Sequence, residues 1–95
     1  MLIRLKTLIV ENNGYRRETF SRDIYVNSDN IISIVDHPAI DDFLLTENLK
    51  HSGEKFCIVK LSHGNKSEDV IAFGTSAMIY SEISEQTRGK GILNG

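Results

Sequence analysis

The chain has 95 residues, of which 40% are hydrophobic and 25% charged, and a formal net charge of −2. This composition is that of an ordinary globular protein and excludes global disorder, and the length predicts one domain with one modest core. No apolar run approaches the roughly 18 residues that cross a membrane, and Arg4 and Lys6 interrupt the opening apolar stretch, so we expect neither a membrane partner nor a signal peptide. The single cysteine, Cys57, cannot form an internal disulfide. We therefore expect a cytoplasmic protein.

The charges are unevenly distributed along the chain. Residues 1–22 carry five cations and two acids, a local charge of +3, whereas residues 23–87 carry four lysines and eleven acids, a local charge of −7. Proteins that bind nucleic acids usually present a basic stripe, and here only the N-terminal strands and the tail could supply one. The alternative is that these cations are solvated residues at strand edges.

Apolar and polar residues alternate at the start of the chain, so residues 1–10 predict a strand. Asn13-Gly14 is the strongest short signal for a hairpin turn, and residues 15–20 could be the returning arm, although they are polar enough to form a loop. The β-branched runs 24–26 and 31–35 predict two short strands, or one bent strand with a polar kink between them.

The most informative stretch contains a second predicted hairpin. Every residue of 56–61 except Lys60 is apolar or cysteine, which predicts a strand covered on both faces. Residues 70–73 have the same character, and the small and polar residues 63–67 between the two runs suit a hairpin loop. The pattern of short strands and turns predicts a mainly β fold, a small and strongly bent five-stranded barrel.

Residues 38–55 are a long insertion for so small a domain. The insertion could begin with a short helix at Pro38, with Asp41 and Asp42 near the helix N-terminus, and continue as an exposed loop over residues 46–53. Insertions of this kind are often functional or contact another subunit.

The end of the chain allows two interpretations. Residues 77–83 could form a short helix capped by Thr75 or Ser76, or they could form the last strand. Few apolar residues follow, so we expect a single β-barrel domain over residues 1–87 and a flexible C-terminal tail over residues 88–95.

Two stretches resemble the Sm and LSm proteins. Val70–Ile79 consists of an apolar strand, Gly74, a short polar step and a second apolar run, as in the second Sm motif, with Phe73 where the family normally has an arginine. Asp29–Asp36, in which Asn30 precedes an apolar strand, is similar to part of the first Sm motif. The resemblance covers nearly half of the chain and implies an Sm/SH3-like barrel that assembles edge to edge into a homo-oligomeric ring of roughly five to seven subunits. It also implies binding of single-stranded RNA or DNA, with Asn30 in one pore loop and Phe73-Gly74 in the other.

A second resemblance is to small bacterial and phage proteins of the FlbD type. It rests on Val26-Asn27, Ile31 and Ile34, followed by Val59, Leu61, Gly64 and the run 70–83. Proteins of this type are short strand meanders closed by a C-terminal helix, which implies the same small β core. An acidic chain with an insertion would suit a phage accessory protein in the host cytoplasm.

The sequence contains no recognisable catalytic constellation. His37, His51 and His63 share no metal-ligand spacing and lie in or beside predicted turns. The apolar neighbours of Cys57 predict an inert core thiol. We therefore expect that the protein is not an enzyme and needs neither a metal nor a cofactor.

Binding is better supported, because aromatic and basic residues are interleaved between Tyr15 and Arg22, a mixture that stacks bases and neutralises phosphates. Our first hypothesis is a non-catalytic, ring-forming protein that binds single-stranded nucleic acid. Its phosphate contacts would be Arg4, Lys6, Arg16 and Arg17, and its base contacts Asn30, Phe73 and Gly74. The second hypothesis is a protein-protein interaction or assembly module that recognises a partner through the 38–55 insertion and the apolar strand edges.

Overall fold

The computed structural model describes the backbone of residues 1–94 and the side chains of residues 1–86. Five antiparallel strands form one sheet in the order β2-β1-β5-β4-β3. The strands are β1 (Leu2–Asn13), β2 (Arg16–Asn27), β3 (Ile31–Asp36), β4 (Phe56–His63) and β5 (Lys66–Phe73); a 3-10 turn, η1 (Ser28–Asn30), precedes β3, and the helices are α1 (Pro38–Thr46) and α2 (Ser76–Asn94). The predicted mainly β fold of five strands is confirmed.

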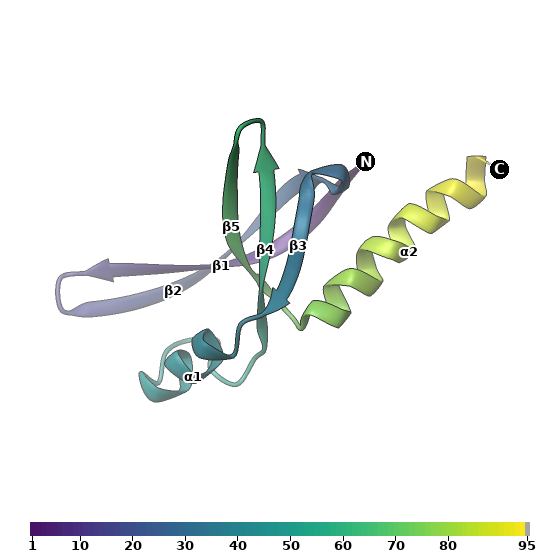
Figure 1. Ribbon diagram of the computed structural model, residues 1–95. Coiled ribbons are helices and arrows are strands. Elements are labelled where there is room, and N and C mark those ends of the chain that lie inside the picture. Colours follow the sequence, from purple (N-terminus) through teal and green to yellow (C-terminus); the bar gives the residue numbers. More distant parts are fainter. Residues whose placement is uncertain (95) are drawn as a thin grey trace.

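The sheet bends sharply where β1 meets β5. β1 pairs with β2 along its whole length, from Leu2 opposite Asn27 to Asn13 opposite Arg16. Its ladder with β5 contains the single pair Thr7 and Ala72. The β1–β2 ribbon therefore crosses the β3–β4–β5 sheet and continues beyond it (Figure 1), which gives the small β structure its barrel-like curvature.

Both predicted hairpins are present. Gly14, at φ +67°, and Tyr15 form the turn between β1 and β2. β2 is a single strand that includes residues 16–20 of the expected returning arm and the run 24–26, which we expected as a separate strand. Gly64, at φ +63°, begins the turn between β4 and β5. A positive φ costs glycine little, which is why both turns contain it.

The two faces of the sheet bury two separate apolar clusters. The first contains Ile3, Leu5, Cys57, Val59, Leu61, Ala72 and Ile79. The second contains Leu8, Leu44 and Phe56, with Val10, Ile40, Phe43, Leu49, Ile71 and Phe73 packed against them. Neighbouring residues of a strand point to opposite faces, so β1, β4 and β5 each contribute to both clusters. Of residues 56–61, Cys57, Val59 and Leu61 are buried on one face and Phe56 on the other, whereas Ile58 and Lys60 are half-buried, so the predicted cover of both faces is confirmed for most of this strand.

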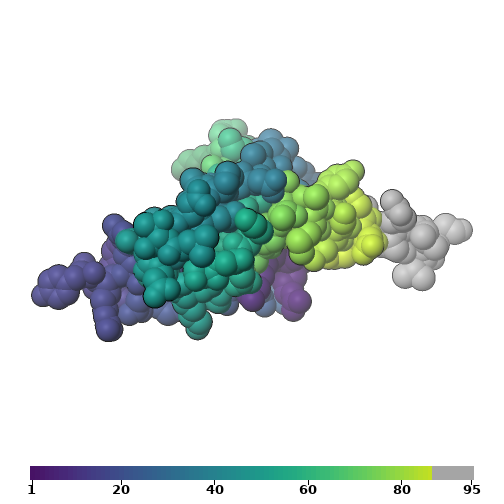
Figure 2. Space-filling model, turned by 90° about the horizontal axis from the view of Figure 1, so that it is seen from below, coloured from purple at the N-terminus to yellow at the C-terminus, as the bar shows by residue number. Residues whose placement is uncertain are grey.

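The 38–55 insertion covers the second cluster. Leu44 of α1 has no exposed surface, and Leu49 packs against the same cluster from the loop after α1. The Thr19 hydroxyl donates to the Lys50 carbonyl at 2.8 Å and anchors this loop on β2. Seen from below, the insertion forms the teal lobe between the tip of the β1–β2 ribbon and α2 (Figure 2). Residues 46–53, which we expected as an exposed loop, are mostly exposed, and Leu49, His51 and Ser52 are half-buried.

Residues 77–83 are helical, which decides between the two interpretations of this segment. The chain leaves β5 through Gly74, at φ +113°, and Thr75 caps α2 by accepting a hydrogen bond from the Met78 amide at 3.2 Å. Ile79 is the one buried residue near the start of the helix, and α2 then projects away from the sheet (Figure 1). The backbone of residues 88–94 belongs to this helix, and the flexible tail expected over residues 88–95 stays a prediction; residue 95 lies outside the described residues.

Candidate functional site

An open apolar groove of about 520 Å³ runs between β3 and α2. Its lining is Ser28, Ile31, Ile32, Ser33 and Ile34 on one side and Ser76, Ala77, Tyr80 and Ile83 on the other. Tyr80 is 66% exposed and Ile32 is 57% exposed. Large apolar side chains that line an open groove are typical of protein and ligand contacts.

A β-bulge directs one of these side chains into the groove. Ile31 pairs with Leu61 and Ser33 pairs with Lys60, so Ile32 is an extra residue in β3. Bulges redirect side chains and often occur beside functional sites. β3 is also the last strand of the sheet, and in the part of the chain that the structure describes no backbone hydrogen bond joins its outer edge to another strand. The groove therefore has one wall with free backbone donors and acceptors.

Asp36 fixes the other wall in place. Its Oδ1 accepts a hydrogen bond of 2.7 Å from the Ser76 amide at the start of α2. This backbone hydrogen bond, and a further one from the Ser76 side chain, lower the pKa of Asp36 below its usual 3.8. An acceptor at the first turn of a helix satisfies an amide that has no partner within the helix.

Acidification is expected to loosen this contact. Because the pKa of Asp36 is lower in the folded protein, its stabilising contribution is present above about pH 4 and is lost as the pH falls through the folded value. The protection factor of the Ser76 amide, which is its unstructured exchange rate divided by its observed rate at the same pH, should fall at low pH in the wild type. Asp36→Asn keeps an acceptor oxygen and should remove this pH dependence of the protection factor, whereas Asp36→Ala should give a low protection factor at every pH. Equal exchange in all three proteins would show that the contact does not hold α2.

The residues taken from the Sm resemblance lie at opposite ends of β4. Asn30 directly precedes Ile31, which pairs with Leu61, whereas Phe73 pairs with Phe56. At about 3.3 Å per residue, these positions on β4 are roughly 17 Å apart. The structure therefore does not bring Asn30 together with Phe73 and Gly74.

Two of the predicted phosphate contacts lie beside aromatic rings. Arg4 is exposed and is paired across the ribbon with Tyr25, which is 67% exposed. The Lys6 ammonium lies 4.6 Å from the centre of the Phe73 ring. Asp23 is the cross-strand neighbour of Lys6 and reduces the local positive charge. This row of side chains, Arg4, Tyr25, Lys6 and Phe73, is here called the basic-aromatic row.

The other two predicted phosphate contacts lie near the tip of the ribbon. Arg16 is exposed beside the turn. Arg17 forms an ion pair with Glu47, and its guanidinium carbon lies 5.3 Å from the centre of the Phe43 ring. Arg17 thus connects the ribbon to the insertion, a contact that the sequence did not reveal.

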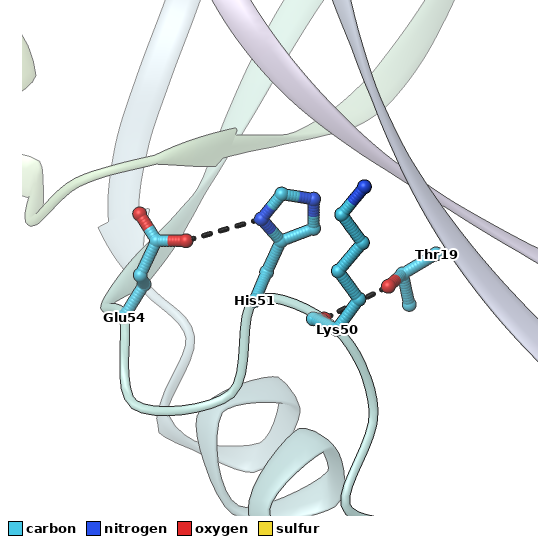
Figure 3. Close-up of polar contacts among 4 residues, drawn as sticks. All are labelled: Thr19, Lys50, His51 and Glu54. Carbon is cyan, nitrogen blue, oxygen red and sulfur yellow. Dashed lines mark hydrogen bonds and ion pairs between the residues drawn. The ribbon is translucent and has the colours of Figure 1, made fainter.

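The histidines form separate contacts. His51 Nδ1 lies 3.2 Å from Glu54 Oε2, and the two side chains point toward one another across the loop after α1 (Figure 3). The His51 ring also packs edge-on against Phe73, whereas His63 pairs with Glu68 at 3.0 Å. Among the residues described, no three His, Cys, Asp or Glu side chains are grouped closely enough to hold a metal ion.

Cys57 has no exposed surface, and burial together with the nearby charge of Asp36 raises the pKa of its thiol to about 11. Relative to the ordinary value of 9.0, this lowers the thiolate fraction at neutral pH about a hundredfold. Reaction with a thiol reagent at pH 8 should therefore be at least about a hundredfold slower in the native protein than in guanidinium chloride. A fast reaction of Cys57 in the native protein would show that the first apolar cluster opens readily.

The fold and the groove define a small β-sheet protein with a helix beside its free edge. Comparison of the chain with protein families, with curated proteins and with solved structures found no significant match. Neither helix, over the part described, is long and apolar enough to cross a membrane.

The groove residues Ile32, Ala77 and Tyr80 were not identified from the sequence. The available signal was the surplus of apolar residues in 31–35, since strict alternation would bury only every second one.

Proposed function

We propose that the protein is a non-catalytic interaction module that captures an extended apolar segment of a partner protein in the groove between β3 and α2. The observation that carries this proposal is the position of an apolar groove beside an unpaired strand edge. The proposal keeps the apolar strand edge of our second hypothesis but moves recognition away from the insertion, because the insertion is occupied in covering the second cluster.

The physical basis is strand addition. An extended peptide can pair its backbone with the free edge of β3, which supplies affinity that does not depend on sequence. Alternate side chains of the peptide then point into the groove, where Ile32 and Tyr80 form apolar walls. The chemistry of the groove selects a partner segment with apolar residues at every second position.

A displayed library of random twelve-residue peptides, selected on the immobilised full-length protein, would test this function. Enriched peptides should share apolar residues at alternate positions. Ala77→Glu, on the exposed face of α2 in the groove, should weaken binding of a selected peptide at least about tenfold, because the carboxylate would be desolvated. Leu45→Glu is the matched control, since Leu45 is 59% exposed on α1 and does not line the groove. No enrichment, or equal effects of the two variants, would refute the proposal.

We propose single-stranded nucleic-acid binding as a second candidate, carried by the basic-aromatic row. Arg4 and Lys6 could neutralise phosphates while Tyr25 stacks a base. In fluorescence anisotropy with a short single-stranded oligonucleotide, Arg4→Glu with Lys6→Glu should abolish binding. Lys50→Glu with Lys66→Glu makes the same charge change at other exposed positions and should leave most of the affinity. Failure of the wild type to bind at low salt would exclude this candidate.

A further inference from the structure

β2 is a long strand with a free outer edge. It ends the sheet on the side opposite β3, contains twelve residues and pairs with β1 without a register shift. Over the residues described, no backbone-backbone hydrogen bond joins β2 to an element other than β1. Proteins usually protect such an edge with charged side chains, proline, a bulge, short length or a covering segment. β2 has no proline, no bulge and no short length, and the insertion contacts it at Arg17 and Thr19. Its charged side chains are therefore the main remaining feature of this edge.

The charges of β2 are complementary to those of a second antiparallel copy. With Phe20 on a two-fold axis, Glu18 of each copy lies opposite Arg22 of the other. In the same register Arg17, whose guanidinium also pairs with Glu47 of its own chain, lies opposite Asp23, and Thr19 lies opposite Ser21. Every charged residue from 17 to 23 therefore faces an opposite charge, the arrangement that favours cross-strand pairing.

Neighbouring registers lack this complementarity. In an antiparallel ladder the outward backbone groups alternate, so two copies of one strand can pair regularly only with a residue on the axis. An axis at Thr19 places Arg16 opposite Arg22, an axis at Glu18 places Glu18 opposite itself, and an axis at Arg22 places Arg22 opposite itself. An axis at Ser21 forms no opposite-charge pair. Backbone geometry therefore requires a residue on the axis, and charge favours Phe20 among residues 18–22 of β2.

The side chains on one face of β2 are free to make these contacts. Glu18, Phe20 and Arg22 alternate along the strand and so share a face, on which Phe20 is 44% exposed. Within the part of the chain that the structure describes, neither the Glu18 carboxylate nor the Arg22 guanidinium forms an ion pair. Aromatic residues directly opposite one another across two strands add to the pairing.

We propose that β2 is a homodimerisation edge, at which a second copy of the chain pairs antiparallel with Phe20 on the two-fold axis. The two five-stranded sheets then form one continuous sheet. Because β3 lies at the opposite edge of each sheet, both grooves stay open, and the dimer can engage two partner segments at once. The proposal does not depend on what the groove binds.

Charge reversal and its rescue test the register, with the solution mass measured by sedimentation equilibrium. Glu18→Arg and Arg22→Glu should each weaken the dimer at least about tenfold, because each creates two like-charge pairs. The double variant restores opposite charges and should regain most of the wild-type affinity. Arg16→Glu, which faces the uncharged Ile24 in this register, is the matched control and should leave the dimer intact. A monomeric wild type, or a double variant that is folded but no more dimeric than the single ones, would overturn the proposal.

A cross-linking experiment tests the position of the axis. Under mild oxidation Phe20→Cys should give a disulfide-linked dimer, because the two residues face each other directly. Arg16→Cys should cross-link far more slowly, and the buried Cys57 should not contribute. Equal cross-linking of the two variants would show that the two copies contact each other elsewhere, for example at the groove between β3 and α2.

Discussion

Replacing Leu44 with alanine is expected to lower the free energy of unfolding by about 2–5 kcal/mol. Leu44 has no exposed surface, and it packs α1 against Leu8 and Phe56 of the second cluster. Truncation would remove apolar contacts and leave a cavity under the insertion. Urea denaturation followed by circular dichroism would measure the loss.

Leu45 supplies the control for this experiment. It is the next residue of α1, it is 59% exposed, and its truncation should change the free energy of unfolding by less than about 0.5 kcal/mol. If the Leu44 and Leu45 variants were equally stable, the insertion could not be part of the core. Because Leu44 lies within residues 41–53, we expect that deleting this segment would unfold the protein. Such a deletion therefore cannot test whether the insertion binds a partner.

Replacing Gly74 with asparagine is expected to cost about 1–3 kcal/mol. Gly74 has a φ of +113° at the exit from β5, a conformation that residues with a side chain rarely adopt. The nearest atom to an added Cβ would be Cδ1 of Ile79 at 3.7 Å, which is ordinary contact. The loss of stability would therefore come from backbone strain rather than from crowding. It should weaken the packing of the start of α2 against the sheet.

Gly64 is the matched position for the same substitution. Its φ of +63° lies in the left-handed region that asparagine tolerates well, and no atom lies within 4 Å of an added Cβ. Gly64→Asn should therefore be much less destabilising than Gly74→Asn in the same urea titration. Equal costs at the two sites would show that the φ of Gly74 relaxes readily.

The strands were largely predictable because their signals are local. The alternation at the N-terminus, the apolar run of 56–61 and the two glycine-containing turns each depend on a few neighbouring residues. The continuity of β2 was harder to predict, since Arg16, Arg17 and Glu18 are as common in loops as on an exposed strand edge. Residues 77–83 form a short apolar run, which suits a helix and a strand equally well.

The candidate site was less predictable because it depends on contacts between distant segments. The groove lies between two segments that Ser76 joins by its hydrogen bond to Asp36, forty positions earlier, and it is lined by Ile32 of one and Tyr80 of the other. The engagement of Arg17 by Glu47 likewise joins two segments that no local pattern relates. Short motifs also carry no information on which end of a strand they will occupy, so the separation of Asn30 from Phe73 along β4 could not be predicted from the sequence.

The single ladder pair between Thr7 and Ala72 has a consequence for the order of folding. The β1–β2 ribbon is a local hairpin and can form as soon as its own residues are available. Its apolar residues Ile3, Leu5 and Leu8 nevertheless stay uncovered until residues 44–72 of α1, β4 and β5 pack against them. Contacts of such long sequence separation are formed late and make folding slow. Among the five strands, β1 therefore depends for its enclosure on partners that follow it in the sequence, and an uncovered ribbon would be prone to aggregation.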